Sequence, residues 1–367
     1  MRRWLFVLGA VVAGWTMIGI AAHATYGARV TADEPQYLLS AISLGNDGDL
    51  DISDELAAEA YRPFHTVDLD PQTYPLDDSG RQVSPHDPML PLLLAIPVRI
   101  GGWVAAKATL AILAAALAML TAWTAVRRFD VRPQVACPIV AVFACTAPLA
   151  TYATQVYPEI PAALAVMLAV ATLCGPLDRR GLAACAAAVV ALPWLSIKYA
   201  PVAATLALLA LWRARDRRPE IAGFGAALIV AAGVYVAAHS VIYGGWTAYA
   251  TGDYFASTGQ FGVVGTTPNY LGRSRRLVGL LVDRDFGIAA WMVGWLALPL
   301  ALGFLLRRRP RDWTVLALPL AAGWLTATFL ASTMHGWWWP GRQLVVVLPV
   351  AVIVVAVAAE RSALLVR

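Results

Sequence analysis

Charged residues are scarce in this 367-residue chain. They make up 14% of it, while hydrophobic residues reach 59%; a typical soluble domain has about 25% charged and 45–50% apolar residues. This composition excludes a disordered chain and an ordinary soluble enzyme, and it indicates an integral membrane protein. At roughly 20 apolar residues per helix, the chain has room for about ten membrane-spanning helices.

Metal and redox motifs are also missing. The four cysteines lie within or at the ends of apolar runs and lack zinc-ligand or redox-pair spacing, so we expect small buried residues: Cys137, Cys145, Cys174 and Cys185. The acidic run 46–55 lacks the glycine and glutamate positions of an EF-hand, which favours a turn followed by a capped helix over a calcium loop. No repeat or low-complexity linker separates a soluble domain, and the sequence predicts a single transmembrane domain over 1–367.

The basic residues occur in short clusters between apolar spans. This pattern argues against nucleic-acid binding and predicts the topology, because arginine and lysine are retained on the cytoplasmic side. With every cluster inside, both termini are cytoplasmic, and the N-terminal apolar stretch is an uncleaved first span rather than a signal peptide. The predicted spans are 4–22, 103–126, 134–153, 160–176, two short spans within 181–212, 221–243, 286–306, 313–333 and 343–359.

Two longer segments are predicted outside the membrane. The first external loop covers 23–100, and its polar part, 23–88, carries thirteen acidic residues against three arginines. Residues 89–100 are apolar but short and contain two prolines, which suits an interfacial or re-entrant helix. The second external loop covers 244–285 and is rich in glycine, tyrosine and threonine.

Adjacent carboxylates open the first external loop. Asp33 and Glu34 lie about ten residues beyond the first span, near the predicted outer surface. Such a pair suits a general base or a metal ligand. A structural role is also open, because Thr31 or Asp33 before Pro35 makes a good helix start.

Further ionisable residues stand near the predicted external ends of later spans. His86 is suited to donate a hydrogen bond to a phosphate or to take up a proton. Alternatively, it is a polar turn residue without a ligand. Glu159 is costly at a membrane surface unless it is paired or functional, although the dipole of the following helix also favours it. Lys198 lies in the next tight turn, where it either extends toward water or binds a lipid phosphate.

Arginines outside the membrane break the charge bias. Arg276 and Arg284 lie in or at the end of the second external loop, and Arg342 lies at the outer end of the last span. Arginine forks bind phosphate well, so all three are candidate phosphate ligands. Pairing with the acidic first loop is the alternative for the second-loop arginines.

These motifs resemble the GT-C superfamily. Asp33–Tyr37, directly after the first span, is similar to the Asp-Glu motif of these polytopic glycosyltransferases. The superfamily uses polyprenyl-phosphate sugars and includes protein O-mannosyltransferases and the aminoarabinose transferases of lipid A. His86–Leu90 resembles the family's basic residue followed by proline and leucine, although Asp87 intervenes. Leu277–Gly287 and Gly341–Arg342 also resemble bacterial members.

The resemblance implies an all-α membrane fold with an active site at the outer face of a bacterial cytoplasmic membrane. It implies inverting transfer of a sugar from a polyprenyl-phosphate donor to a glycan, lipid or protein acceptor. Asp33 would be the general base, supported by Glu34, and Glu159 would be the second acidic residue. The phosphate would be held by His86, Lys198 and Arg342. Some members require a divalent metal ion, but no metal site is evident in this sequence.

A flippase for lipid-linked sugars or a secondary transporter is the alternative. Transporters place ionisable groups near the midplane of the membrane. Here the interiors of the predicted spans are almost free of acidic residues, which argues against ion-coupled transport unless Lys107 or His239 proves central. A non-catalytic scaffold would explain the acidic loop but not the ionisable groups at successive external turns.

Overall fold

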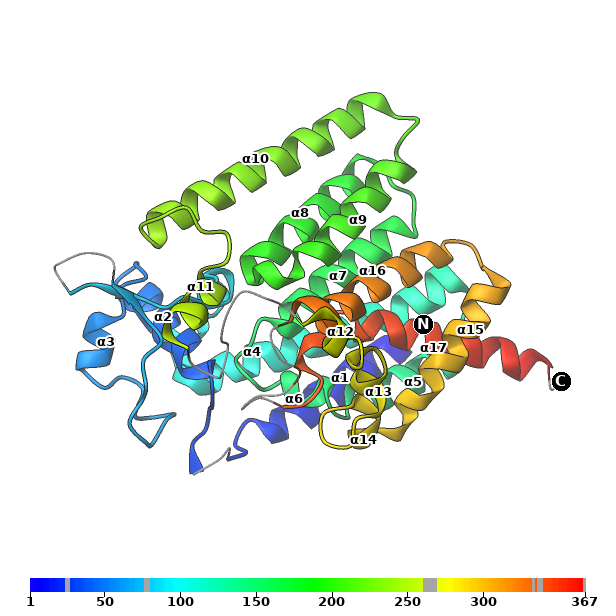
Figure 1. Cartoon of the computed structure of the whole chain (residues 1–367). Coiled ribbons are helices and arrows are strands. Elements are labelled where there is room, and N and C mark those ends of the chain that lie inside the picture. The colour runs from blue at the N-terminus through cyan, green and yellow to red at the C-terminus, as the bar shows by residue number, and fades with distance from the viewer. Residues whose placement is uncertain (24–26, 76–79, 260–268, 332–333, 335–338, 366–367) are drawn as a thin grey trace.

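The fold is almost entirely helical (Figure 1). This computed structural model describes residues 1–23, 27–75, 80–259, 269–331, 334 and 339–365. Parts of both predicted external loops therefore lie outside the described residues: 24–26, 76–79 and 260–268. One small sheet belongs to the first external loop, in which β1 (Tyr74–Pro75) pairs antiparallel with β2 (Gln82–Val83).

Each predicted span coincides with an apolar helix or helical stretch. These are α1 (Arg2–Gly19), the second part of α4 (Met89–Phe129), α5 (Pro133–Ala144) with α6 (Leu149–Tyr152), α7 (Glu159–Leu173), α8 (Arg179–Leu195), α9 (Ala200–Arg213), α10 (Arg218–Ile242), α15 (Ala297–Arg308), α16 (Trp313–Leu325) with the π-helix Thr326–Leu330, and α17 (Leu348–Leu365). Within the described residues, 3 helical segments are individually long and apolar enough to cross a membrane: α4, α10 and Trp313–Leu330. The prediction of an all-α membrane protein is confirmed.

The apolar stretch after the first loop is broken where the sequence predicts. Gly101 and Gly102 leave helical geometry inside α4, and Gly102 has a φ of 61°, which glycine adopts without steric cost. The short predicted helix 89–100 precedes this break, and the predicted span follows it. The change of direction separates the segment that carries His86 from the bundle helix.

The predicted hairpin within 181–212 is also present. Helices α8 and α9 are joined by the 3-10 turn Ile197–Tyr199. With 17 and 14 residues, α8 and α9 are about 26 and 21 Å long. Both are shorter than the roughly 30 Å hydrocarbon core. Their connecting turn carries Lys198.

The bundle is built around α17, whose residues from Val350 to Val357 are all buried. In contrast, α10 lies at the edge of the bundle (Figure 1), and only 11% of its most apolar 18-residue stretch is buried. Its exposed side chains are aliphatic, including Ile229, Val230 and Val241. This apolar surface suits contact with lipid.

The loop elements gather at one end of the bundle. Figure 1 shows α2 (Glu34–Asn46), α3 (Ser53–Ala57) and α11 (Ala250–Thr258) there, while α1 begins and α17 ends toward the other end. The two external loops also bind each other, since Thr251 Oγ1 donates to the Pro85 carbonyl at 2.7 Å. The remaining short helices are α12 (Tyr270–Arg273), α13 (Arg276–Val282), α14 (Ile288–Trp291) and the 3-10 segments Val293–Leu296 and Arg342–Leu344.

Candidate active site

A buried ion network joins four residues that are far apart in the sequence. Arg342 donates from Nη1 to Asp33 Oδ2 at 2.8 Å and from Nε to Glu159 Oε1 at 2.9 Å. Lys198 Nζ donates to the same Glu159 oxygen at 2.8 Å. Two carboxylates and two cations therefore share one cluster.

Each member of the network is placed by the beginning of a local element. Asp33 is the N-cap residue of α2, and Glu159 is the first residue of α7. Arg342 follows Gly341, whose φ of 86° makes the turn into the last 3-10 segment. These helix starts and turns converge at the loop end of the bundle.

The network is almost dry. The side chains of Arg342, Asp33 and Glu159 are 7%, 9% and 0% exposed, and that of Lys198 is 21% exposed. The Arg342 guanidinium lies 4.0 Å from the centre of the Tyr157 ring, in cation–π geometry. Charges at such depth persist only when they are paired, so each member depends on the others.

Asp33 is ionised in this arrangement. Burial is the largest single influence and raises the pKa of its carboxyl group, but the effects of Arg342, His86 and Lys198 together outweigh burial and hold the pKa below its usual value. Although Asp33 occupies the N-cap position, its side chain makes no cap hydrogen bond. Its Oδ1 accepts no hydrogen bond from any residue that the structure describes. The side chain is therefore committed to the network rather than to the helix.

Glu34 takes a different position from its neighbour. Its Oε2 accepts from the Thr31 amide at 2.9 Å, and its Oε1 accepts from the Val156 amide at 2.7 Å. The carboxylate thus connects the start of α2 to the segment before α7. Glu34 positions the backbone on both sides of the network, and no hydrogen bond connects it with Asp33 in the described part of the chain.

His86 lines the site from the end of the first loop. Its Nε2 lies 2.9 Å from Gln72 Oε1, and its ring lies 4.7 Å from that of Tyr37. Burial is the largest influence on its pKa and, together with Arg342, lowers it below the usual value despite the nearby Asp33. The imidazole is therefore neutral at physiological pH.

Asp87, which the sequence analysis treated only as a departure from the family motif, is a central connection. Its Oδ1 accepts from Tyr235 Oη at 3.0 Å and pairs with His239 Nε2 at 3.1 Å, both on α10. Its Oδ2 accepts from the amide of Ile197 at 3.2 Å. Asp87 therefore holds the loop that carries His86 to the turn that carries Lys198.

A cavity of about 510 Å³ opens beside the network. Charged and polar side chains line one part of it, and small or apolar side chains from α9 and the π-helix line another. Its lining includes Asp33, His86, Lys198, Arg342, Pro201 and Leu330. The cavity is large enough for a sugar phosphate and the beginning of an apolar chain.

The arginines of the second external loop lie elsewhere. Arg276 Nη1 donates to the carbonyl of Ala331 at 2.7 Å, and Arg273 Nη1 donates to that of Phe329 at 2.6 Å. Both brace the end of the π-helix at the edge of the cavity. The Arg284 side chain is 96% exposed and 4.0 Å from Asp285, so the prediction that Arg284 joins the site is corrected. Neighbouring acidic and backbone groups satisfy these side chains locally.

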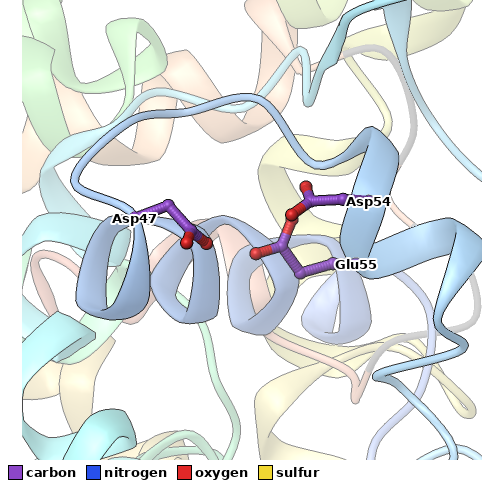
Figure 2. A group of neighbouring side chains, drawn as sticks. All are labelled: Asp47, Asp54 and Glu55. Atoms are coloured by element: carbon purple, nitrogen blue, oxygen red, sulfur yellow. The ribbon is translucent and has the colours of Figure 1, made fainter.

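The described residues hold one group of three side chains with metal-ligand geometry, and it lies outside this network. It consists of Asp47, Asp54 and Glu55 in the first loop (Figure 2). At the network, Asp33 Oδ2 and Glu159 Oε1 already accept from Arg342 and Lys198. The donor set there is that of an ion-pair cluster, in which protein cations offset the carboxylates.

Solved structures of other proteins share the fold of this chain. No protein-family profile and no curated protein matches this sequence. The structure is similar to crystal structures of ArnT from Cupriavidus metallidurans bound to undecaprenyl phosphate and in the apo state, with TM-scores of 0.58 and 0.56 and identities of 15% and 13%. Each similarity covers 98% of this chain but only 61% and 60% of the ArnT chain, so this chain spans about three-fifths of its neighbours' length.

The chain therefore shares its helical fold with these ArnT structures. The all-helical fold that the resemblance implied is the fold observed.

Proposed function

We propose that this protein is an inverting glycosyltransferase that uses a polyprenyl-phosphate sugar. It transfers the sugar to an acceptor hydroxyl of a glycan, lipid or protein at the outer face of a bacterial cytoplasmic membrane. One observation carries the proposal: Asp33, Lys198 and Arg342 line a single cavity although they come from distant parts of the chain. The neighbour bound to undecaprenyl phosphate gives independent support for a donor of this lipid class.

Asp33 is the proposed general base. Its Oδ1 is available to accept a hydrogen bond from the hydroxyl group of the acceptor, while Oδ2 is held by Arg342. The acceptor oxygen attacks the anomeric carbon, the bond to the phosphate oxygen breaks, and the hydroxyl proton passes to Asp33. A single displacement inverts the anomeric centre. Base help of this kind contributes about 10²–10⁴-fold.

The leaving phosphate requires positive charge already in place. Arg342 and Lys198 supply it from the cavity wall, and the neutral His86 supplies a hydrogen-bonding nitrogen. Such preorganised groups stabilise charge as it develops in the transition state. When a donor phosphate draws Arg342 toward itself, Asp33 loses part of its pairing. The pKa of Asp33 then rises, which makes it a stronger base when the donor is bound.

Glu159 has a positioning role in this proposal. Its single paired oxygen, Oε1, orients both Arg342 and Lys198. Without it, two buried cations would repel each other across a dry pocket. Glu159 therefore fixes the cations in the spacing that a phosphate needs.

The two ionisable residues that could have favoured transport have other partners. Lys107 Nζ donates to the Arg29 carbonyl at 2.6 Å, and His239 pairs with Asp87. Both hold the first external loop against the bundle. Their contacts support a structural role rather than an ion-coupled pathway.

A reconstituted assay tests the proposal. Purified protein in liposomes is supplied with a polyprenyl-phosphate sugar and a panel of hydroxyl acceptors, and the product's anomeric configuration is determined. We expect transfer with inversion, and loss of transfer in Arg342→Ala but not in Asp68→Asn, an exposed carboxylate of the same loop. Movement of the donor across the bilayer without transfer would support the flippase alternative instead.

A further inference from the structure

Three carboxylates outside the proposed active site converge in the first external loop. Figure 2 shows Asp54 and Glu55 on one side and Asp47 facing them. One oxygen from each lies within 4.8 Å of the others. Like charges at this spacing repel each other, so the arrangement requires a compensating group.

The loop between these residues is held in shape by its own hydrogen bonds. Ser43 Oγ donates to the Asp51 carbonyl at 2.8 Å, and Asp51 Oδ1 accepts from the amides of Ser53 and Gln82 at 3.1 and 2.9 Å. Asp49 Oδ1 accepts from Ser43 Oγ and from the Asp51 amide, both at 3.0 Å, so Asp49 and Asp51 are occupied within the loop. The other three acids are left facing one another across a preformed turn.

Glu55 provides the second observation. Only 5% of this residue is exposed, and its Oε2 has no hydrogen-bond partner among the described residues. No described lysine or arginine forms an ion pair with Asp47, Asp54 or Glu55. An unpartnered buried carboxylate directed into an acidic cluster points to a bound cation.

We propose that Asp47, Asp54 and Glu55 bind one divalent, oxygen-preferring cation of the size of calcium. Carboxylate oxygens within 4.8 Å of one another are close enough to share one cation, and calcium binds oxygen ligands at about 2.3–2.6 Å. Magnesium demands near-ideal octahedral geometry, whereas calcium accepts an irregular set of carboxylates such as this one. Asp47 and Asp54 are exposed, which leaves room for water to complete the coordination.

The position of the cluster indicates what the cation does. Asp47 caps the C-terminal end of α2, where the helix dipole makes negative charge unfavourable. A cation there neutralises that end and ties α2 to the first turn of α3. Because α2 has 13 residues, about 20 Å of helix separates this site from Asp33 at the other end. The cation is therefore a structural brace for the helix that presents Asp33.

Direct binding tests the proposal on the full chain in detergent. After chelation, the protein is dialysed against radiocalcium, and its thermal unfolding is followed with calcium or magnesium. We expect a dissociation constant of about 10⁻⁴–10⁻³ M, as in extracellular calcium modules, and a rise in Tm with calcium. Glu55→Gln should weaken binding at least about tenfold, whereas Asp68→Asn should bind as the wild type does.

A second variant keeps the test decisive if Glu55→Gln fails to fold. Asp47→Asn/Asp54→Asn changes two exposed side chains and should also abolish the calcium-dependent rise in Tm. The proposal is overturned if the wild type binds no calcium at about 10 mM. It is also overturned if these variants bind calcium as the wild type does, or if magnesium binds equally well.

Discussion

Arg342 and Asp33 are 309 positions apart in the sequence, yet Nη1 of the first lies 2.8 Å from Oδ2 of the second. Both side chains are buried, and both line the same cavity. This ion pair places a proposed phosphate ligand against a proposed base. Each of the two residues therefore changes the electrostatic environment of the other.

Replacing Arg342 should affect the donor more than the acceptor. Arg342→Ala removes the guanidinium that faces the cavity, and we expect the donor KM to rise at least about tenfold while the acceptor KM changes little. Arg342→Lys keeps the charge but loses the planar fork, so only partial recovery is expected. Steady-state kinetics with each substrate varied in turn provide the measurement. An unchanged donor KM in Arg342→Ala would remove this residue from the phosphate site.

Glu159→Gln should destabilise the protein. The change leaves Arg342 and Lys198 close together without the carboxylate they share, and breaking a buried pair in this way costs about 3–5 kcal/mol. Thermal unfolding in detergent should show the loss. The double variant Glu159→Gln/Lys198→Met should be more stable than Glu159→Gln alone, because one unpaired cation is removed. Additive effects of the two changes would contradict the network.

Asp87→Asn should loosen the proposed phosphate-binding side of the cavity. Asp87 holds α10 and the amide of Ile197, next to Lys198. We expect the donor KM to rise several-fold, with a smaller change in kcat. Tyr235→Phe removes only one of these hydrogen bonds and serves as the matched control, with an effect of about 1 kcal/mol or less on stability. Equal effects of the two variants would argue against a role for the Asp87 charge.

Stability without added calcium should fall as the pH rises from about 5 to 8. The pKa of Glu55 is raised from 4.5 to about 8 in the folded protein, so in this window the folded state holds a proton that the unfolded state has released. The stabilisation from that proton is complete below the unfolded pKa of 4.5 and is lost as the pH rises through the folded pKa of about 8. Glu55→Gln should reduce this pH dependence by an amount on the order of a few degrees in Tm. A pH profile identical to that of the wild type would contradict the raised pKa.

The order of the apolar helices was predictable because its signals are local. Apolar length and arginine clusters located the helices, and the short proline-containing stretch 89–100 was predicted apart from the span 103–126. The short hairpin followed from two basic clusters that had to share one side of the membrane. The position of α10 at the edge of the bundle depends on long-range packing, which no local pattern encodes.

The site was only partly predictable for the same reason. Asp33, His86, Lys198 and Arg342 stood out as ionisable residues near the ends of apolar spans, and they line one cavity. Arg284 showed the same pattern but points into solvent. The sequence analysis predicted no role for Asp87, because its partners on α10 lie far from it along the chain. Its position beside His86 was the signal that the sequence offered.

The acidic loop illustrates a different gap between sequence and structure. The EF-hand pattern counts ligand positions along the chain, and by that count the sequence predicted an ordinary turn. The three facing carboxylates instead come from the end of one helix and the start of the next. Burial of Glu55 was not visible in the sequence.

The turnover of Asp33→Asn at saturating donor and acceptor tests the central claim most directly. Asparagine keeps the size of the side chain and a hydrogen-bond acceptor for Arg342, but it cannot take up the hydroxyl proton. We predict that kcat for sugar transfer falls about 10²–10⁴-fold while donor binding persists. Transfer by Asp33→Asn at the wild-type rate would contradict the account.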